Sequence, residues 1–427
     1  MRLHEGPAMP SNTLGFRPAD RLGKIKISAS AAMTDKAREL KARGIKVISL
    51  SSGEPDFATP PHAVEAAHKA ALGGDTKYPP QTGTAALLKA VQRKFARENG
   101  LEYAIDELLT GNGAKQLIFD AIMASCNSGD EVLIPMPGWI TYADIVNLSG
   151  ATPVPIACPA SSGFHIRPED LEAAITPRTR WLILNFPNNP SGSTGGEAQL
   201  RAIADVLLRH PHVWVLTDDI YEHLIYDGSA FVTIAQVEPR LKDRTLTING
   251  VSKAYAMTGW RVGYCGGPKE LIAAMNVIQL QATGGICTVA QAAAVAVLDG
   301  PQYLLAEHAR IYRERRDVVL ELLSHAPGIE CHRPSGAFYV FANIEGLLGK
   351  STAGGTVIEG DLDFVAALLA EKHVATVQGG AYGMSPYFRL SYATDMASLR
   401  EACGRIIEFC GELRDVHRTP AAGRRAS

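Results

Sequence analysis

The sequence predicts an α/β fold: a large domain with a mostly parallel central sheet flanked by helices, followed by a smaller α+β domain. Two observations support this prediction. Between residues 84 and 265, helical patterns alternate with short apolar runs that are bounded by turn residues. After about residue 305, this alternation gives way to a long helix, short strands and a final helix.

The first elements of the large domain are two helices. Leu87, Val91 and Phe95 recur at helical spacing, and Gly100 ends that helix. A glycine turn then begins a second helix over residues 113–124. Later apolar runs predict the sheet, with strands at 131–134, 181–185, 213–217, 245–248 and 262–265 and a helix over 198–208.

The C-terminal part has a different pattern. A long helix over 306–323 precedes short strands near 337–341 and 387–391, and a last helix covers 398–413. Both ends of the chain lack periodicity, which predicts disorder there. The expected division is a disordered extension over 1–17, a segment over 18–50 that packs with the small domain, a large domain over 51–305, a small domain over 306–413 and a disordered tail over 414–427.

Composition limits the partners of the protein. Forty-two basic residues against forty-four acidic ones give a net charge of −2, so we expect no nucleic acid and no anionic membrane as a partner. No apolar run is long enough to span a bilayer, and the N-terminus lacks the apolar stretch of a secretory signal. Seven scattered cysteines without a CxxC pair predict reduced thiols, a cytoplasmic location and no metal site.

Lys253 is the first candidate for chemistry. It follows the predicted strand at 245–248, at the end of a parallel strand where ligands bind. Its amine can form a Schiff base with a carbonyl group if its pKa is depressed. Arg261, eight residues later, offers a planar cation to a phosphate. A lysine followed by an arginine is more often a pair of solvent-exposed side chains. Here, however, the apolar neighbours Met257 and Trp260 are residue types that are uncommon at a protein surface.

A second candidate group follows the apolar strand at 213–217, which ends in two carboxylates, Asp218 and Asp219. One interpretation is that they cap a helix. The other is that one of them keeps a pyridine nitrogen protonated, so that the ring can accept electrons. Tyr221 then stands where its hydroxyl group could bond to a ring oxygen, although a purely structural tyrosine is equally compatible with the sequence.

Three further segments complete the set. Asn189 lies in a rigid Pro- and Gly-containing turn after another strand. Small residues from Gly111 to Ala114 open a helix whose N–H groups can bind an anion. Arg389 lies inside an apolar strand and needs a partner, either an internal carboxylate or a substrate carboxylate. An amine, a carboxylate, phosphate donors and an arginine together predict a pyridoxal 5′-phosphate site.

These motifs resemble the fold-type-I, class I aminotransferases, most closely the bacterial aspartate aminotransferases of the rhizobial and thermophile subgroup. The resemblance covers the chain from about residue 17 to 413. Its motifs occur in the order and spacing of the family: Ser52-Gly-Glu-Pro-Asp-Phe57, Asn188-Asn-Pro-Ser-Gly192, Thr217-Asp-Asp-Ile-Tyr221, Lys253 through Arg261 and Arg389-Leu-Ser-Tyr-Ala-Thr394.

The resemblance implies a role for each matching residue. Lys253 is expected to hold the cofactor as a Schiff base and to move the substrate's Cα proton, with Asp218 at the pyridine nitrogen. The remaining cofactor contacts are expected from Tyr221 and Asn189 at the phenolic oxygen, Trp139 stacked on the ring, and Gly113, Ala114, Lys115 and Arg261 at the phosphate. The substrate is expected to meet Gly53, Trp139, Asn189 and Arg389. Tyr78 is expected to reach the phosphate of a partner subunit, which implies a homodimer.

The implied function is a ping-pong transamination between an L-amino acid, aspartate by resemblance, and a 2-oxo acid such as 2-oxoglutarate. Three positions depart from the family: Ala114 replaces a glycine of the phosphate loop, Gly138 precedes Trp139 where relatives often have tyrosine, and Gly250 stands where some subgroups have a hydroxyl residue. No cation for a distal carboxylate is identified, because Met123 falls where one thermophile relative has a lysine.

Two kinds of alternative function remain. An aromatic or prephenate aminotransferase, or a C–S lyase, would use the same fold. A non-catalytic cofactor-binding regulator would carry a basic DNA-binding domain before the fold, where we expect only about 17 unpatterned residues.

Overall fold

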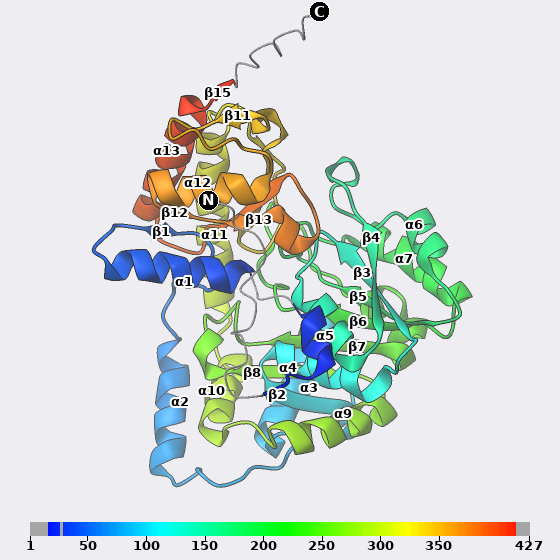
Figure 1. Cartoon of the computed structure of the whole chain (residues 1–427). Coiled ribbons are helices and arrows are strands. Elements are labelled where there is room, and N and C mark those ends of the chain that lie inside the picture. Colours follow the sequence, from blue (N-terminus) through cyan, green and yellow to red (C-terminus); the bar gives the residue numbers. More distant parts are fainter. Residues whose placement is uncertain (1–15, 26–28, 416–427) are drawn as a thin grey trace, which may run out of the picture.

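The computed structural model describes residues 16–25 and 29–415 (Figure 1). Of the two predicted disordered ends, residues 1–15 and 416–427 therefore lie outside the described residues. Arg414–Asp415, which fall within the predicted tail, form the short strand β15 and pair with β11 (Lys350–Ser351). These two residues therefore belong to a strand, although they were expected in the disordered tail.

A seven-stranded sheet in the order β2-β8-β7-β6-β5-β3-β4 forms the centre of the large part. Its strands are β2 (Leu108–Asn112), β3 (Glu131–Met136), β4 (Thr152–Ala157), β5 (Thr179–Leu184), β6 (Trp214–Asp218), β7 (Thr245–Gly250) and β8 (Val262–Gly266). All neighbours pair in parallel except β8, which runs antiparallel to both β2 and β7. This confirms the predicted α/β class with a mostly parallel sheet.

Two strands of this sheet were absent from the sequence prediction. β2 contains the polar and glycine-rich run that was interpreted only as the approach to a helix. β4 contains Pro153 and Pro155 and lies at the edge of the sheet, where a missing N–H does not interrupt a hydrogen-bond ladder. Prolines disfavour the prediction of a strand, so β4 was missed from sequence, but a strand at the edge of a sheet can contain them.

Helices cover both faces of the sheet because alternate side chains of each strand point to opposite sides. Ile183 of β5 packs in a cluster with α4 (Ala114–Ser125), α5 (Thr141–Ser149) and α9 (Lys269–Ala282). Leu182 of the same strand packs in a second cluster with α7 (Glu197–Arg209). At the β2–β8 end, α3 (Ala85–Asn99), α10 (Thr288–Asp299) and α2 (Pro61–Leu72) complete the core.

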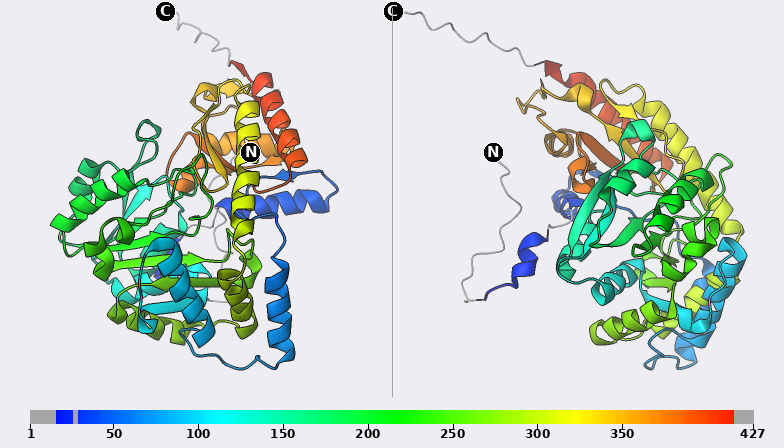
Figure 2. Two further views of the ribbon diagram at one scale, coloured as in Figure 1. Left: turned by 180° about the vertical axis from the view of Figure 1, so that it is seen from behind. Right: turned by 90° about the vertical axis from the view of Figure 1, so that its right-hand side faces the viewer.

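The long helix α11 (Tyr303–Leu323) leads from the large part to the small one, as Figure 2 shows. There, an antiparallel sheet in the order β13-β14-β10-β9 packs with α12 (Asp361–Lys372) and α13 (Met396–Glu412). Its strands are β9 (Glu330–Cys331), β10 (Tyr339–Asn343), β13 (Val377–Gln378) and β14 (Tyr387–Ser391). The predicted domain boundaries, 51–305 and 306–413, stay predictions.

The segment expected to pack with the small domain divides in two. β1 (Ile48–Ser49) pairs with β12 (Val374–Ala375), and α1 (Ala29–Ala42) contacts β12 and β13. The short 3-10 helix at Asp20–Lys24 instead contacts α5 of the large part. Over the described residues, no helix combines the length and the apolar character that crossing a bilayer requires.

Candidate active site

Most of the predicted site residues line one cavity of about 470 Å³. It lies at the carboxyl ends of β6 and β7, where the loop after β5, the start of α4 and the small sheet meet. The predicted residues that line it are Gly53, Ala114, Lys115, Trp139, Asn189, Asp218, Tyr221, Lys253, Arg261 and Arg389. Two others do not line it: Gly113, which lies close to the Arg261 guanidinium group, and Tyr78, whose side chain is fully exposed.

Lys253 lies in the connection between β7 and β8 and faces the cavity. Its Nζ atom donates a 2.7 Å hydrogen bond to the carbonyl oxygen of Gly53. Removal of the ammonium group from water, reinforced by the charges of Arg261 and Arg389, lowers the pKa of Lys253 to about 8. Since the neutral amine is the nucleophile, the side chain can react with a carbonyl group near neutral pH.

Asp218 is the last residue of β6 and is almost completely buried. Its Oδ2 atom accepts a 2.7 Å hydrogen bond from the Tyr142 hydroxyl, whereas Oδ1 has no partner among the described residues. Burial raises the pKa of Asp218 to about 6. The adjacent Asp219 accepts instead from the Thr217 hydroxyl at 2.6 Å and does not line the cavity. Neither carboxylate caps a helix. The Oδ2 atom of Asp219 also lacks a hydrogen-bond partner among the described residues, but only Asp218 lines the cavity and can present its unpartnered oxygen to a bound group that carries an N–H.

Arg389 carries a buried guanidinium group into the cavity from β14. Its Nη1 and Nη2 atoms donate to the Asn189 side-chain oxygen at 2.9 Å and to the Ser51 carbonyl at 2.6 Å. Its central carbon lies 4.3 Å from the ring centre of Tyr339 and 5.0 Å from that of Tyr382. Among the described residues, no carboxylate forms a salt bridge with it. The internal ion pair considered from the sequence is therefore not found, and a ligand carboxylate fits the site.

Tyr221 meets a tyrosine that sequence analysis did not identify. Its hydroxyl lies 2.9 Å from the hydroxyl of Tyr339, which comes from the small sheet. Tyr142, on the first turn of α5, was also missed, although its position three residues after Trp139 was a usable signal. Its ring packs edge-on against the Trp139 ring, with centres 5.3 Å apart. The contact with Tyr339 left no such signal, because it joins residues 118 positions apart.

The start of α4 and Arg261 lie together at the wall of the cavity. Gly113 has a φ of +83°, and a Cβ atom there would lie 2.4 Å from Nη2 of Arg261. Arg261 donates to the carbonyl oxygens of Thr258 and Asn112 at 2.8 and 3.1 Å. The first N–H groups of a helix have no partner within the helix, so those beginning at Ala114 can bind a phosphate together with Arg261.

The side chain of Lys115 extends toward the ring of Trp139. Its Nζ atom lies 4.7 Å from the centre of that ring. Burial, with the nearby charge of Arg261, lowers the pKa of Lys115. Met123, the position at which a distal cation was sought in the sequence, also lies on α4 but does not line the cavity. Lys115 is thus a cationic side chain at the cavity wall, whereas the family resemblance implied for it only a contact with the phosphate.

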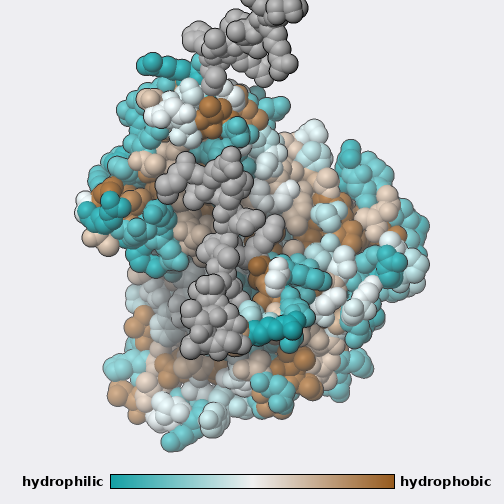
Figure 3. Space-filling view, viewed as in Figure 1, coloured by the Kyte–Doolittle hydropathy of each residue, from teal (hydrophilic) through white to brown (hydrophobic). Residues whose placement is uncertain are grey.

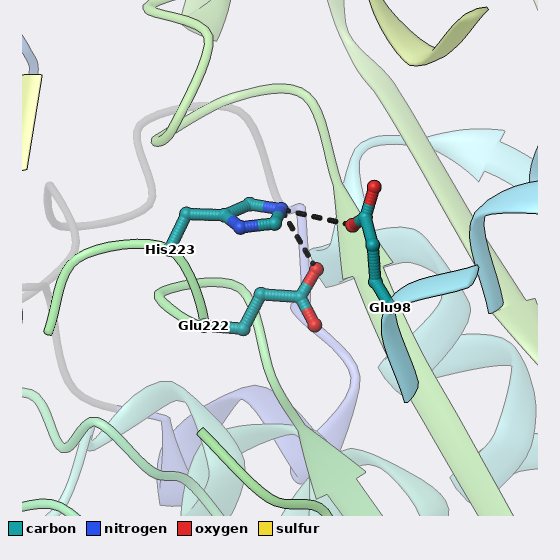
Figure 4. A group of neighbouring side chains, drawn as sticks. All are labelled: Glu98, Glu222 and His223. Carbon is teal, nitrogen blue, oxygen red and sulfur yellow. Dashed lines mark ion pairs between the residues drawn. The ribbon is translucent and has the colours of Figure 1, made fainter. Parts of the chain in front are cut away.

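A cluster of charged side chains follows Tyr221 in the sequence. It joins the segment that contains Tyr221 to α3. Figure 4 shows Glu98, Glu222 and His223 pointing toward one another. The His223 Nε2 atom lies 3.1 Å from Glu222 and 3.2 Å from Glu98. Lys94, which is fully buried, pairs with Glu222 and donates to the Asn99 side chain at 2.7 Å.

These two carboxylates and the imidazole have the composition of a metal site, and their ligand atoms lie within 4.8 Å of one another. However, Lys94 already provides a cation there. Burial opposes charge on His223, but Glu222 and Glu98 raise its pKa to about 9. Two carboxylates are then balanced by an ammonium and an imidazolium group, so we interpret the cluster as a buried ion-pair network.

Removing one charge should destabilise the fold. Lys94→Met leaves Glu222 buried without its ammonium partner and should lower the free energy of unfolding by roughly 3–5 kcal/mol. The folded-state pKa of His223 is raised from 6.5 to about 9, so its stabilisation is complete below the lower value and is lost as pH rises through the higher one. Thermal unfolding of His223→Asn should therefore differ from wild type strongly at pH 7 and little at pH 10.

The exposed His212 gives a matched control. His212→Asn should change the melting temperature little at either pH. A His223→Asn effect that is equally large at pH 7 and pH 10 would contradict the assignment of a charged imidazole.

Comparisons with known proteins agree with this chemistry. Residues 45–406 match the family model described as aminotransferase class I and II. The chain is 54% identical over 399 residues to an aspartate aminotransferase of Rhizobium meliloti, covering 93% of this chain and 97% of that protein. It is 51% identical over 395 residues to an aspartate/prephenate aminotransferase of Cereibacter sphaeroides, covering 92% and 99%.

Solved structures give the same result. The crystal structure of the Rhizobium meliloti aspartate aminotransferase superposes with a TM-score of 0.91 at 53% identity, covering 94% of this chain and 100% of that one. The Thermus thermophilus aspartate aminotransferase with maleate has a TM-score of 0.86 at 37% identity, covering 92% and 100%.

Proposed function

This chain belongs to the class I and II aminotransferase family, and on that premise we propose that it transfers the amino group of aspartate to 2-oxoglutarate. Its cofactor is pyridoxal 5′-phosphate, whose pyridine ring accepts the electron pair released when the substrate's Cα–H bond breaks. The unpartnered Oδ1 atom of Asp218, facing the same cavity as Lys253 and Arg389, is the observation that carries the proposal.

We propose that Asp218 receives the N–H of the pyridine ring and keeps that nitrogen positively charged. Tyr221 would donate its hydroxyl proton to the phenolic oxygen. The Asn189 side-chain oxygen already accepts from Arg389, so its amide nitrogen is left to donate to the same phenolic oxygen. Trp139, at the cavity wall, is the ring proposed to stack on the cofactor.

Lys253 would act twice, first as the amine that holds the cofactor and then as the base at the substrate's Cα. Its lowered pKa supports the second role, because a base with a pKa near the working pH is neutral often enough to accept a proton. The bond to the Gly53 carbonyl fixes the direction of the Nζ atom. We propose that the cofactor's phosphate lies at the N-terminus of α4, held by Arg261.

The substrate would be held by its two carboxylates. Arg389, which has no carboxylate partner among the described residues, would bind the α-carboxylate. Lys115 is the cation that we propose for the second carboxylate, because it reaches the cavity wall beside Trp139. The solved Thermus neighbour was described with maleate, a four-carbon dicarboxylate like aspartate.

Prephenate is a second candidate acceptor. A relative that is 51% identical to this chain is named aspartate/prephenate aminotransferase. The aromatic rings of Trp139, Tyr339 and Tyr382 at the cavity wall are compatible with a cyclic substrate. The C–S lyase alternative would release ammonia and pyruvate without any 2-oxo acid, so product analysis separates it. The cytoplasmic location also stays a proposal, and it rests on composition.

We further propose a homodimer with shared sites. Tyr78 is fully exposed and lies outside the cavity of its own chain. A second cavity of about 610 Å³ opens on Arg261 and is lined by Trp260 and Cys287 among others. Large apolar side chains are exposed on α2 and α9, and Figure 3 shows hydrophobic residues along that lower part of the molecule. We propose that α2 and α9 face a second copy, and that the partner's Tyr78 enters the second cavity.

Substitutions at the reactive centre should separate neighbouring residues. Lys253→Ala should abolish transamination, and Asp218→Asn should lower kcat roughly 100-fold because the pyridine nitrogen loses its charged partner. Asp219→Asn changes an equally buried neighbour that faces away from the cavity, so its kcat should stay within a few-fold of wild type. Near-normal turnover by Lys253→Ala, or equal losses in both aspartate variants, would contradict these assignments.

Donor specificity tests the assignment of Lys115. An amino-donor screen with 2-oxoglutarate and oxaloacetate should give aspartate and glutamate as the best donors. Lys115→Gln should lower kcat/KM for aspartate about 10–100-fold, since a charge-assisted hydrogen bond contributes about 1.5–3 kcal/mol. Alanine, which lacks a second carboxylate, serves as the control substrate and should be affected little. If both acidic amino acids are poor donors, aspartate is excluded as the substrate while transamination stands.

The dimer proposal predicts a role for an exposed tyrosine. Tyr78→Phe should weaken cofactor binding about 10–100-fold, because one hydrogen bond to a charged group contributes about 1.5–3 kcal/mol. Tyr303→Phe, another exposed tyrosine, should leave the cofactor affinity unchanged. Sedimentation velocity should show one species of twice the chain mass. A monomer that binds the cofactor with full affinity would rule out shared sites.

A further inference from the structure

Tyr339 stands where the two parts of the molecule meet, and none of the roles given above uses its hydroxyl group. It is the first residue of β10, is 1% exposed, and lines the cavity. Its hydroxyl lies 2.9 Å from that of Tyr221, and its ring centre lies 4.3 Å from the guanidinium carbon of Arg389. One side chain thus touches both the proposed cofactor tyrosine and the proposed substrate arginine.

The strand register fixes this arrangement. β10 and β14 are antiparallel, with Phe341 opposite Arg389 and Tyr339 opposite Ser391. Tyr339 and Phe341 are two residues apart and share a face of the sheet, so Tyr339 is a diagonal neighbour of Arg389. A Cβ atom at Gly53 would lie 2.3 Å from the Tyr339 hydroxyl oxygen. Neighbours on several sides therefore hold the ring in place.

The direction of the tyrosine–tyrosine hydrogen bond follows from the proposed role of Tyr221. Two hydroxyl groups in contact share a single hydrogen bond, and either could donate. If Tyr221 donates its proton to the phenolic oxygen of the cofactor, Tyr339 must donate to Tyr221. Such chains are cooperative, because each donated bond makes the next donor stronger.

The charge of Arg389 affects the hydrogen bond from Tyr339 to Tyr221. Burial raises the pKa of Tyr339, whereas the charge of Arg389 lowers it. The guanidinium group therefore makes Tyr339 a better donor than it would be beside a neutral group. A carboxylate bound to Arg389 would neutralise that charge and weaken the donation from Tyr339 to Tyr221.

We propose that Tyr339 is a positioning residue that couples carboxylate binding at Arg389 to the hydrogen bond made by Tyr221. The inference rests on the roles proposed above for Tyr221 and Arg389. When a carboxylate binds, Tyr221 becomes a weaker donor to the phenolic oxygen, and the nitrogen that joins Lys253 to the cofactor becomes more basic. The bound substrate thereby changes the proton affinity at the reacting centre.

The test uses the cofactor-loaded protein and maleate, a dicarboxylate without an amino group. The pH titration of the cofactor's visible absorbance gives an apparent pKa, which maleate should raise in the wild type. Tyr339→Phe keeps the ring against Arg389 but loses the hydroxyl, so its rise should be smaller by about 0.3 unit or more, a twofold change in the protonation equilibrium. Part of the rise should survive, because Asn189, which accepts a hydrogen bond from Arg389, also joins that arginine to the phenolic oxygen under the proposed roles.

Tyr382→Phe is the matched control. Tyr382 lies 5.0 Å from the same guanidinium carbon, and the structure shows no hydrogen bond between its hydroxyl and that of Tyr221. It should keep the full rise. Maleate affinity should change less than about threefold in both variants, since both rings stay, whereas Tyr339→Leu should weaken it about tenfold.

A double-mutant comparison tests the coupling itself. In a Tyr221→Phe background, Tyr339→Phe should have no further effect on the maleate-induced rise. A wild-type rise in Tyr339→Phe, or an undiminished effect of that substitution in the Tyr221→Phe background, would overturn the inference. A wild-type protein whose absorbance ignores maleate would overturn the substrate proposal first and the coupling with it.

Discussion

One oxygen of the Asp218 carboxylate is buried without a hydrogen-bond donor from the described residues, and the surrounding contacts hold it in that position. An unpaired buried carboxylate oxygen destabilises a fold unless other contacts hold it. Tyr142 fixes the second oxygen, and Asn185 donates to the Asp218 carbonyl at 2.8 Å. The ion-pair network that contains Glu222 secures the chain a few residues later. A bound ring with an N–H would satisfy the remaining oxygen.

The opposite wall of the cavity depends on the small sheet. Arg389 and Tyr339 come from neighbouring strands of that sheet, yet their contacts are with Asn189, Tyr221 and Ser51, which belong to other parts of the chain. The cavity is therefore completed only when the small sheet is docked. Under the proposed roles, carboxylate binding at Arg389 would act on the reacting centre through its contacts with Asn189 and Tyr339.

Much of this fold could be predicted from local pattern, and much of the site from motifs at strand ends. Residues such as Lys253 and Asp218 were identifiable because buried strands ended in chemically reactive groups. Sequence could not choose between Asp218 and Asp219 without the family, since only the geometry at the end of β6 separates the carboxylates. Tyr142 meets Asp218 across 76 positions, and no local pattern reveals such a contact. Met123 does not line the cavity, and sequence could not show this because a matching position does not fix the direction of a side chain.

The reversed strand β8 has a consequence for how such proteins change over evolutionary time. β7 and β8 are antiparallel neighbours, with Gly250 opposite Gly263. Lys253 and Arg261 therefore lie on one short loop whose two ends are held together by strand pairing. Under the proposed roles, that loop would set the distance between the amine that holds the cofactor and the guanidinium group at the cofactor's phosphate. An insertion or deletion in the loop would change that distance and disturb the proposed contacts at both ends. The length of the loop between β7 and β8 is therefore a constraint on cofactor binding, and it is separate from the groups proposed to select the substrate.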